Sequence, residues 1–432
     1  MSVYDTHYDL LVAGGGFAGF ASAVAAAERG LSVLLVEKSN ALGGAPGTCL
    51  VNPFMPYFTW REDNSLALLS GGLFARVCNE LINMTKALDG DDSPYARRPI
   101  QIFNEEYLKV ILNRMALRAG VTLLFHTAVI AAGRDGNRIT SVTLSNSDGL
   151  HEMSAGAYVD ATGDAELSVL AGFPTHLGRE GDNLCQPMTL CFRVGEVDTA
   201  VFRENRALMQ SLYKQFKAEG KIKNPREDVL IFGTTAEHVL HFNTTRVVKL
   251  NPVDAADVTR AEIEAREQVF ELCSFLKDNV PGFEKARLLS TALHIGVRES
   301  RMIDGEYTLT QDDLTSMTKF PDGIACCNYD IDIHNPEGSG TSHWYFPRGE
   351  YYTIPYRCLI PRGADNLLVA GRCISSTHEA QASYRIMPTV CTLGEAAGAA
   401  AALAKTSGVS VRNVDTDALR SELEAAGAIL KI

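Results

Sequence analysis

A glycine-rich turn close to the N-terminus constrains this chain more than any other feature. An apolar stretch, Tyr8–Ala13, leads into Gly14-Gly-Gly16-Phe-Ala-Gly19, then an alanine-rich stretch, and then Val33–Val36 with Glu37 behind it. Together these segments predict a strand, a tight turn, a helix and a second strand that ends on an acid. Gly14 permits the turn, Gly16 lets the backbone approach a pyrophosphate, and Gly19 lets the helix pack closely against the sheet. The segment therefore predicts a dinucleotide-binding site.

The helix after the turn is expected to supply the phosphate contacts. Its first residues, Phe17 and Ala18, offer free N–H groups and the partial positive charge of a helix N-terminus. Glu37 lies eighteen residues after Gly19, where a carboxylate accepts hydrogen bonds from ribose hydroxyls, and Lys38 follows it. The alternative is a glycine-rich turn in an ordinary α/β fold that binds no nucleotide.

The bulk composition predicts a large protein that acts on a small molecule. With 432 residues, of which 46% are hydrophobic, the chain can bury the cores of two domains. The net charge of −12 argues against nucleic acid and anionic membranes as partners. The predicted first strand begins after seven residues, which leaves no room for a signal peptide, and no stretch has the length and apolar character of a membrane span. A homo-oligomer is compatible with this composition.

The ten cysteines are scattered and form no C-x-x-C pair, while Cys326 and Cys327 are adjacent. This spacing suits neither a structural zinc site nor an iron–sulfur cluster, so we expect no metal. Reduced thiols are typical of a cytoplasmic protein. Cys49 follows Gly43-Gly44 closely enough for a redox role beside a cofactor, but a small buried thiol is the simpler interpretation.

The chain is expected to divide into three parts: residues 1–174, 175–355 and 356–432. The first part contains the glycine turn, an irregular region over 46–100, a helix over 105–119, a strand over 121–125 and an antiparallel excursion over 129–159. The second part mixes strand-like pieces with helices over 201–220 and 255–279 and reads as an inserted domain. The third part again has the strand and helix pattern of the first, with a strand over 366–370 and a helix over 388–405. The predicted class is α/β, a Rossmann-like sheet interrupted by a mostly antiparallel substrate domain with helices.

Three further segments favour FAD over a nicotinamide dinucleotide. Two glycines in Leu42-Gly43-Gly44 let backbone amides approach a flat ring. The turn Ala161-Thr-Gly-Asp164 comes after the antiparallel excursion, and Gly371-Arg372 leads to a helix whose first turn, Met387-Pro388-Thr389, can face the flavin pyrimidine. A long FAD needs this distant return of the chain. Predicted cofactor contacts are Gly14, Gly16, Phe17, Ala18, Gly19, Glu37, Lys38, Gly43, Gly44, Val129, Thr162, Gly163, Asp164, Gly371, Arg372, Met387 and Thr389.

The layout resembles the two-dinucleotide-binding-domain flavoproteins, whose fold is glutathione-reductase-like. Within them it is most similar to the FAD-dependent oxidoreductase family, near the flavoproteins of the heterodisulfide reductase type, and distantly to the fumarate reductase flavoprotein group. The matching motifs include Asn52-Pro-Phe-Met55, Gly296-Val-Arg298-Glu-Ser-Arg301, Ile354–Pro361, Val369–Arg372 and Arg385-Ile-Met-Pro388. The resemblance implies a noncovalent FAD and a redox reaction without naming a substrate. The chain lacks clustered cysteine motifs, so no iron–sulfur cluster is expected.

The candidate catalytic residues lie in segments that can reach the flavin ring. Arg385 and His378 directly precede the helix expected to face the pyrimidine, where a cation stabilises the reduced ring or holds a substrate carboxylate. The alternatives are a backbone contact for Arg385 and a surface loop for His378.

His294 and Arg298 are expected on one face of an alternating strand, as a pocket wall or, for Arg298, in a buried salt bridge.

His334 shares a face with Asp330 and Asp332 in a second alternating segment. A hydrogen-bonded imidazole over the flavin is more plausible there than a metal site, and a strand with one wet face gives the same pattern. The aromatic segment around His343, Trp344 and Tyr351-Tyr352 suits either a stacked ligand or an interface core.

The sequence thus predicts an FAD-dependent oxidoreductase that transfers hydride between flavin N5 and a small polar substrate with CH–OH or CH–NH groups. One alternative is reduction or desaturation of a C–C bond in a carboxylate. Another is an electron-transfer flavoprotein that serves a partner protein.

Overall fold

A seven-stranded sheet forms the centre of the molecule. The computed structural model describes residues 5–90 and 99–432. Along the sheet the order is β5, β2, β1, β8, β7, β6, with β19 paired to β8. The strands are β1 (His7–Ala13), β2 (Val33–Val36), β5 (Thr122–Leu124), β6 (Ala128–Asp135), β7 (Arg138–Asn146), β8 (Gly149–Asp160) and β19 (Leu367–Val369). The strands β5, β2, β1, β8 and β19 pair in parallel, whereas β6, β7 and the first part of β8 form the expected antiparallel excursion. The predicted α/β class is confirmed.

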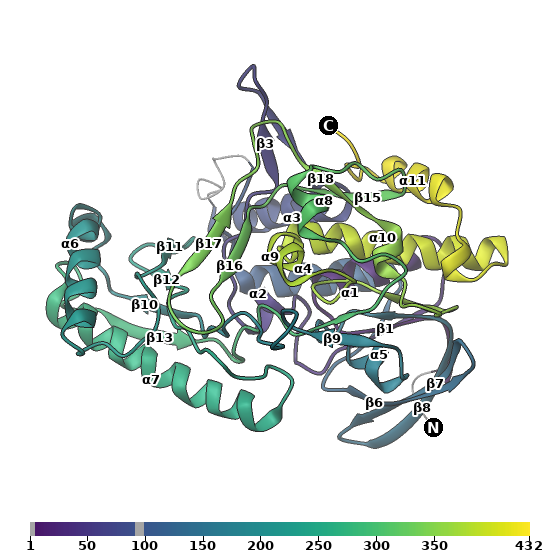
Figure 1. Cartoon of the computed structure of the whole chain (residues 1–432), viewed down its shortest axis with the longest axis horizontal. Coiled ribbons are helices and arrows are strands. Elements are labelled where there is room, and N and C mark those ends of the chain that lie inside the picture. The colour runs from purple at the N-terminus through teal and green to yellow at the C-terminus, as the bar shows by residue number, and fades with distance from the viewer. Residues whose placement is uncertain (1–4, 91–98) are drawn as a thin grey trace.

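Two helices from opposite ends of the sequence pack together on one side of this sheet (Figure 1). They are α1 (Phe17–Ala27) and α10 (Met387–Ser407). A Cβ added at Gly394 or Gly398 would lie 2.1 Å from the carbonyl oxygen of Ala18 or Ser22, so the two helix backbones almost touch. The Ser22 hydroxyl donates to the Gly394 carbonyl at 2.9 Å across this contact. The N-terminal turn and the C-terminal return are therefore parts of one packed unit.

The region expected to be irregular over 46–100 contains regular structure, which corrects that prediction. It holds α2 (Ala45–Thr48), β3 (Phe58–Trp60), β4 (Leu66–Leu68) and the 18-residue helix α3 (Gly72–Asp89), while 91–98 lie outside the described residues. Gly71 and Gly72, which predict a break, instead begin α3. A Cβ at Gly71 would lie 2.3 Å from the Gly427 carbonyl, so the glycines allow tertiary contact. The predicted helix over 105–119 is present as α4 (Glu105–Arg118).

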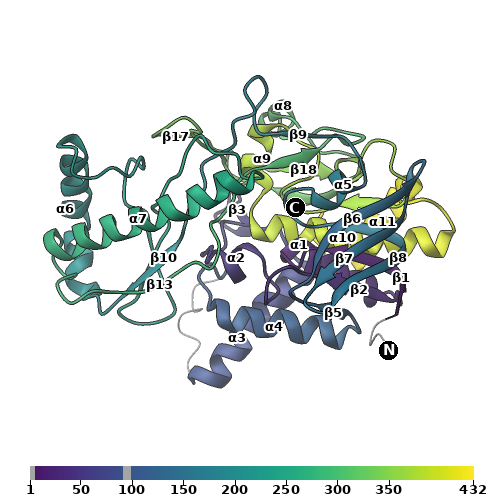
Figure 2. The ribbon, with the colours of Figure 1, turned by 90° about the horizontal axis from the view of Figure 1, so that it is seen from below.

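A second sheet and two long helices lie apart from the central sheet, as Figures 1 and 2 both show. The antiparallel order is β11, β12, β10, β13. The elements are β10 (Phe192–Gly195), β11 (Ile231–Gly233), β12 (Leu240–Phe242), β13 (Arg287–Thr291), α6 (Thr199–Ala218) and α7 (Ala255–Asn279). Phe192 and Phe242 stack at 4.7 Å between ring centroids and anchor a separate apolar core that spans Met188 to Ile295.

Short two-stranded sheets and helices join these two bodies. The strand pairs are β9 (Thr175–Leu177) with β14 (Arg301–Ile303), β15 (Gly323–Cys327) with β18 (Tyr352–Pro355), and β16 (Ile331–His334) with β17 (Thr341–Trp344). The remaining helices are α5 (Glu166–Leu170), α8 (Gln311–Thr315), α9 (His378–Tyr384) and α11 (Thr416–Ala425). Leu309, Ile324 and Tyr352 pack in the core around α1 and α10. The division at residues 174 and 355 stays a prediction.

Within residues 5–90 and 99–432, no single helix combines the length and apolar character needed to cross a membrane. In the same residues only the pair α9 and α10, bent by 96°, reaches that length and composition together.

Candidate functional site

The glycine turn between β1 and α1 exposes bare backbone at a helix N-terminus. Gly16 precedes α1, no side chain caps the helix, and its first turn contains no acid. The first N–H groups of α1 are therefore free for an anionic ligand. A Cβ at Gly19 would lie 1.8 Å from the Gly14 carbonyl oxygen, so only glycine allows the helix to begin this close to the turn. The geometry matches what the G-x-G-x-x-G spacing predicts.

A second glycine pair lies directly against this turn. Gly16 and Gly43 form a parallel bridge between two segments that are distant in the sequence. A Cβ at Gly44 would lie 2.8 Å from the Gly16 Cα, closer than real Cβ contacts. The two segments thus meet with no side chain between them, which creates a cradle lined by peptide groups.

Glu37 fixes the turn through both carboxylate oxygens. Oε2 accepts a hydrogen bond from the Gly15 N–H at 2.5 Å, and Oε1 accepts one from the Ser39 N–H at 2.7 Å. The side chain is buried, and each carboxylate oxygen can accept a further bond. Glu37 is therefore held rigidly at the end of β2. Its neighbour Lys38 points elsewhere, because its Nζ donates to Glu166 at 2.9 Å.

The Thr162–Asp164 turn and Gly371-Arg372 lie side by side. The Arg372 Nη2 donates to Asp164 Oδ1 at 2.6 Å, and the Ser300 hydroxyl donates to the same oxygen at 2.5 Å. Burial opposes ionisation of Asp164, but the Arg372 charge and the Ser300 bond outweigh it and hold the pKa below its usual value. This network links the segment 296–301 to the glycine turn, because a Cβ at Gly371 would contact Ala18.

Helix α10 begins beside these segments without a side-chain cap. Ile386 precedes it, and Pro388 occupies its first turn. Met387 and Thr389 are buried in that turn. The close packing on α1 brings the free N–H groups of both helices into one rigid unit. Val129, the remaining predicted contact, lies in β6 opposite Leu144.

Arg298 carries a charge that no carboxylate within the described residues balances by an ion pair. Its Nη1 donates to the Pro187 carbonyl at 2.6 Å and to the Thr189 hydroxyl, and its Nη2 donates to Asn243 at 3.3 Å. Burial, then the charge of Arg385, lowers the pKa of Arg298 to about 9. The expected salt bridge to a glutamate is absent among these contacts. Arg298 is a cation stabilised by neutral acceptors.

Arg385 lies at the bend between α9 and α10 and completes a polar cluster with β16. Its Nη2 donates to Gln186 Oε1 at 3.4 Å and lies 3.9 Å from Asp332 Oδ2, while its buried Nε has no protein partner. Burial opposes ionisation of Asp332, but His334 and Arg385 hold its pKa well below the usual value. Asp332 Oδ1 is also buried without a hydrogen bond.

His334 is buried in a single tautomer. Arg246 Nη2 lies 3.1 Å from Nδ1, and because a guanidinium only donates, Nδ1 must accept. The proton is thus on Nε2, which lies 3.4 Å from Asp332. Burial and the charge of Arg298 lower the pKa of His334 to about 3. His334 is therefore a neutral donor to Asp332.

The structure separates the remaining histidine candidates. His378 is buried rather than on a surface loop, and its Nδ1 lies 2.7 Å from Glu299, whose other oxygen accepts from the Gln186 N–H. The alternating strand expected around His294 and Arg298 is absent, because β13 ends at Thr291. His294 is exposed instead, and its N–H donates to the Thr48 carbonyl at 3.2 Å.

The Cys49 thiol lies between a hydroxyl group and a backbone carbonyl. Its Sγ lies 3.6 Å from the Ile295 carbonyl oxygen, and burial raises the pKa of the thiol. A high pKa suppresses the reactive thiolate. Cys49 and all other cysteines of the described residues are free, and no group of three or more His, Cys, Asp or Glu side chains there is placed to hold a metal ion.

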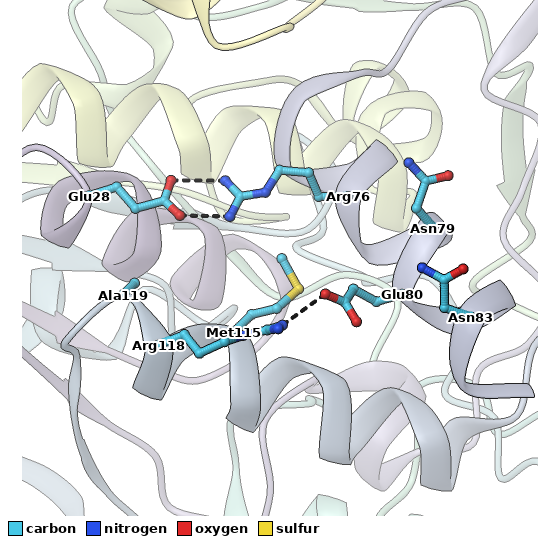
Figure 3. Close-up of a pocket in the computed structure, with 8 residues that line it drawn as sticks. All are labelled: Glu28, Arg76, Asn79, Glu80, Asn83, Met115, Arg118 and Ala119. Atoms are coloured by element: carbon cyan, nitrogen blue, oxygen red, sulfur yellow. Dashed lines mark hydrogen bonds and ion pairs between the residues drawn. The ribbon is translucent and has the colours of Figure 1, made fainter. Parts of the chain in front are cut away.

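A pocket of about 570 Å³ lies away from these segments (Figure 3). It is lined by α3, α4 and the end of α1, with the ion pairs Glu28–Arg76 and Glu80–Arg118 across it. None of the candidate residues lines it. The charged groups it contains are already paired, so it offers no unmatched chemistry.

Three residues that contact Arg298, His334 or Arg385 cannot be identified from sequence motifs. Gln186, Arg246 and Asn243 come from loops or strand ends with no recognisable spacing, and they contact Arg385, His334 and Arg298 only through the tertiary fold. In the sequence each of these three residues is simply a polar residue between apolar runs. That pattern is too common to indicate a functional site.

The chain matches a known protein family over nearly its whole length. A model described as FAD dependent oxidoreductase matches residues 9–423, nearly the whole chain. The protein is thus an FAD-dependent enzyme, and it belongs to the FAD dependent oxidoreductase family. The predictions of an enzyme and of FAD as its cofactor are confirmed. A search of curated proteins finds no match.

Solved structures resemble the chain in fold alone. A geranylgeranyl bacteriochlorophyll reductase-like protein from Thermoplasma acidophilum is 14% identical, with a TM-score of 0.45 over 97% of this chain and 82% of that one. The p-nitrophenol 4-monooxygenase PnpA from Pseudomonas putida DLL-E4 is 11% identical, with a TM-score of 0.48 over 95% and 83%. The flavin-dependent brominase Bmp2 is 13% identical, with a TM-score of 0.47 over 97% and 83%. Such low similarity carries no argument about the reaction.

Proposed function

We propose that this enzyme oxidises a small carboxylate-bearing substrate at a CH–OH or CH–NH carbon. Bound FAD supplies the hydride acceptor. The observation that carries the proposal is Arg298, a partly buried cation that lacks a carboxylate partner and has Arg385 as a charged neighbour. Two neighbouring guanidinium groups that are partly shielded from solvent favour an anion strongly. A substrate carboxylate satisfies both.

The cradle described above fits the cofactor. The pyrophosphate would contact the N–H groups of Phe17 and Ala18, where the bare backbone of Gly16 and Gly44 leaves room. Glu37 would accept from ribose hydroxyls, since each of its oxygens has one acceptor position left. Met387 and Thr389, in the uncapped first turn of α10, would face the flavin pyrimidine. Gly43, Val129, Asp164 and Gly371-Arg372 would complete the contacts.

Substrate orientation would come from Arg298 and Arg385 together. Arg298 is held by three neutral acceptors on Pro187, Thr189 and Asn243, so its position is fixed before a ligand arrives. Arg385 has its Nε free for an additional acceptor. Preorganised donors of this kind cost little reorganisation on binding.

Asp332 is the carboxylate best placed to take the proton that leaves the hydroxyl or amino group. Its lowered pKa makes it a weak base in the free enzyme, and a substrate carboxylate at Arg385 would raise that pKa by adding a negative charge beside it. Its Oδ1 is buried without a hydrogen-bond partner, whereas Oδ2 accepts from Tyr329 at 3.2 Å and lies beside His334 Nε2. The imidazole cannot act as the base itself, because Arg246 occupies its only acceptor nitrogen. His334 therefore serves as a positioning residue for Asp332 in this proposal.

Anaerobic titration of the FAD-loaded enzyme tests the reaction class. The visible flavin band is expected to bleach with 2-hydroxy acids or amino acids and not with their amides. Arg298→Gln should raise the apparent dissociation constant of the active acid by about 10- to 100-fold, because a hydrogen bond to a charged group is worth about 1.5–3 kcal/mol. Arg203→Gln, an exposed arginine on α6, is the matched control. Bleaching by neutral sugars or amines alone would contradict the proposal.

Reduction of a C–C double bond in a carboxylate is the second candidate. It is favoured by the pKa of Arg298, which burial and neighbouring arginines lower to about 9, so the guanidinium becomes a usable proton donor. In that case the reduced enzyme should be reoxidised anaerobically by α,β-unsaturated carboxylates. Hydroxy and amino acids should then leave the oxidised flavin unchanged.

A further inference from the structure

Arg226 presents a further buried guanidinium, beside Arg246, Arg298 and Arg385 already described. Its backbone is fixed on both sides, because the Tyr213 hydroxyl and Lys217 Nζ donate to its carbonyl and its N–H donates to Asn224 Oδ1. The residue is only 5% exposed. The chain thus holds this charge in place through the backbone, without using its side chain.

The guanidinium of Arg226 has hydrogen-bond donors that no protein acceptor satisfies. Both Nε and Nη1 of Arg226 are buried and have no hydrogen-bond partner. Asp228 forms an ion pair with Arg226 at 3.6 Å from Nε, but this distance is too long for a hydrogen bond and the Asp228 side chain is half-exposed. Buried donors without partners destabilise the folded protein, because they lose their hydrogen bonds to water and gain none in return. A ligand that accepts these hydrogen bonds would remove that cost.

Arg226 lies close to the site that the proposed function assigns to the substrate. The next residue along the chain, Glu227, forms an ion pair with Arg246 at 3.1 Å, and Arg246 in turn lies 3.1 Å from His334, which borders Asp332 and Arg385. Arg246 is already occupied by the Gly338 and Gly340 carbonyls and by His334. Among these arginines, Arg226 therefore has the most unmet donor capacity.

We propose that Arg226 binds a second acidic group, so that the substrate carries one carboxylate held by Arg298 and Arg385 and another held by Arg226. This inference rests on the proposed function and narrows its substrate class to compounds with two acidic ends. The distal group takes no part in the chemistry. Its recognition by a buried, prepositioned cation provides selectivity against substrates with a neutral end.

Ligand binding to the FAD-loaded full-length enzyme tests the inference without knowledge of the natural substrate. The probes are unbranched α,ω-dicarboxylates of three to eight carbons, each compared with its monoamide, and the readout is the shift of the visible flavin spectrum. At least one dicarboxylate is expected to bind about 10-fold more tightly than its monoamide. In Arg226→Gln the two constants should differ by less than about 2-fold, with monoamide binding unchanged.

Variants and outcomes separate the two proposals. Arg226→Lys keeps the charge and should retain part of the dicarboxylate preference, while Arg203→Gln on α6 should retain all of it. Equal binding of every dicarboxylate and its monoamide by the wild-type enzyme would overturn the inference and needs no variant. Failure of all carboxylates, single or double, to bind would overturn the proposed function as well.

Discussion

The contact between α1 and α10 gives a sharp test of how the fold builds the cofactor site. In Gly394→Ala the new Cβ would lie 2.1 Å from the Ala18 carbonyl oxygen, whereas ordinary contacts begin near 3.4 Å. The helices must therefore separate by about 1.3 Å, and overpacking of this kind costs about 1–3 kcal/mol. The Ser22 bond to the Gly394 carbonyl would weaken as well, at a cost of about 1 kcal/mol. We expect a loss of about 2–4 kcal/mol in the free energy of unfolding.

The same displacement should weaken cofactor binding. Both helices begin at the proposed FAD contacts, so a shift of about 1 Å is large compared with the tolerance of a preorganised site. The FAD dissociation constant, measured by fluorescence titration of the apoprotein, should rise by at least about 10-fold. Urea unfolding of the apoprotein gives the stability.

The matched control is Gly233→Ala, since nothing lies within 4 Å of a Cβ at that position. It should change stability by less than about 0.5 kcal/mol. If Gly394→Ala has the stability and FAD affinity of the wild type, the tight helix contact does not hold the site together, and the reasoning is refuted.

Two further substitutions test buried carboxylates. Glu37→Gln replaces one acceptor by an NH₂ group facing the Gly15 or Ser39 N–H, so FAD affinity should fall at least about 10-fold. The exposed control Glu62→Gln should leave FAD affinity unchanged. If Glu37→Gln also leaves it unchanged, Glu37 does not bind the ribose. Burial raises the pKa of Glu395 to about 7 from 4.5, so the folded state binds more protons than the unfolded state between these values. Wild-type stability should therefore fall by about 1–3 kcal/mol as the pH rises from about 4.5 to about 7, and Glu395→Gln should abolish that fall; parallel stability curves in urea would contradict it.

The parts of the fold with a local signature can be predicted from the sequence. The glycine turn, α1 and α10 are each predicted by residues within their own segment. The structure shows why those residues are needed, for example through the close approach of Gly19 to the Gly14 carbonyl. Helix α3 escapes prediction because Gly71 and Gly72 normally interrupt helices. Only glycine fits at these two positions because Gly427 and Glu395 pack directly against them. Both neighbours lie more than 300 positions away, so no local pattern can reveal them.

The substrate side of the site is only partly predictable. The sequence indicates Arg298 and Arg385, but their roles depend on partners such as Gln186 and Asn243 that arrive from other segments. The alternation around His294 indicates a strand, yet this segment instead bonds to Thr48 and Thr189 as isolated contacts. Arg226 has no signature in the sequence, because an arginine's lack of partners is visible only when the surroundings are known.

The pairing of the first helix with a late one has a consequence for how the protein is made. Ser22 and Gly394 are 372 positions apart, and β19, which completes the parallel pairing with β8, also comes from the last fifth of the chain. Almost every residue of α1 is buried, so on the ribosome this helix emerges long before its cover is synthesised. We expect the nascent chain to expose an apolar helix for most of translation and to depend on chaperones in that period. Because both helices carry proposed FAD contacts, we expect flavin to bind tightly only after α10 has docked on α1.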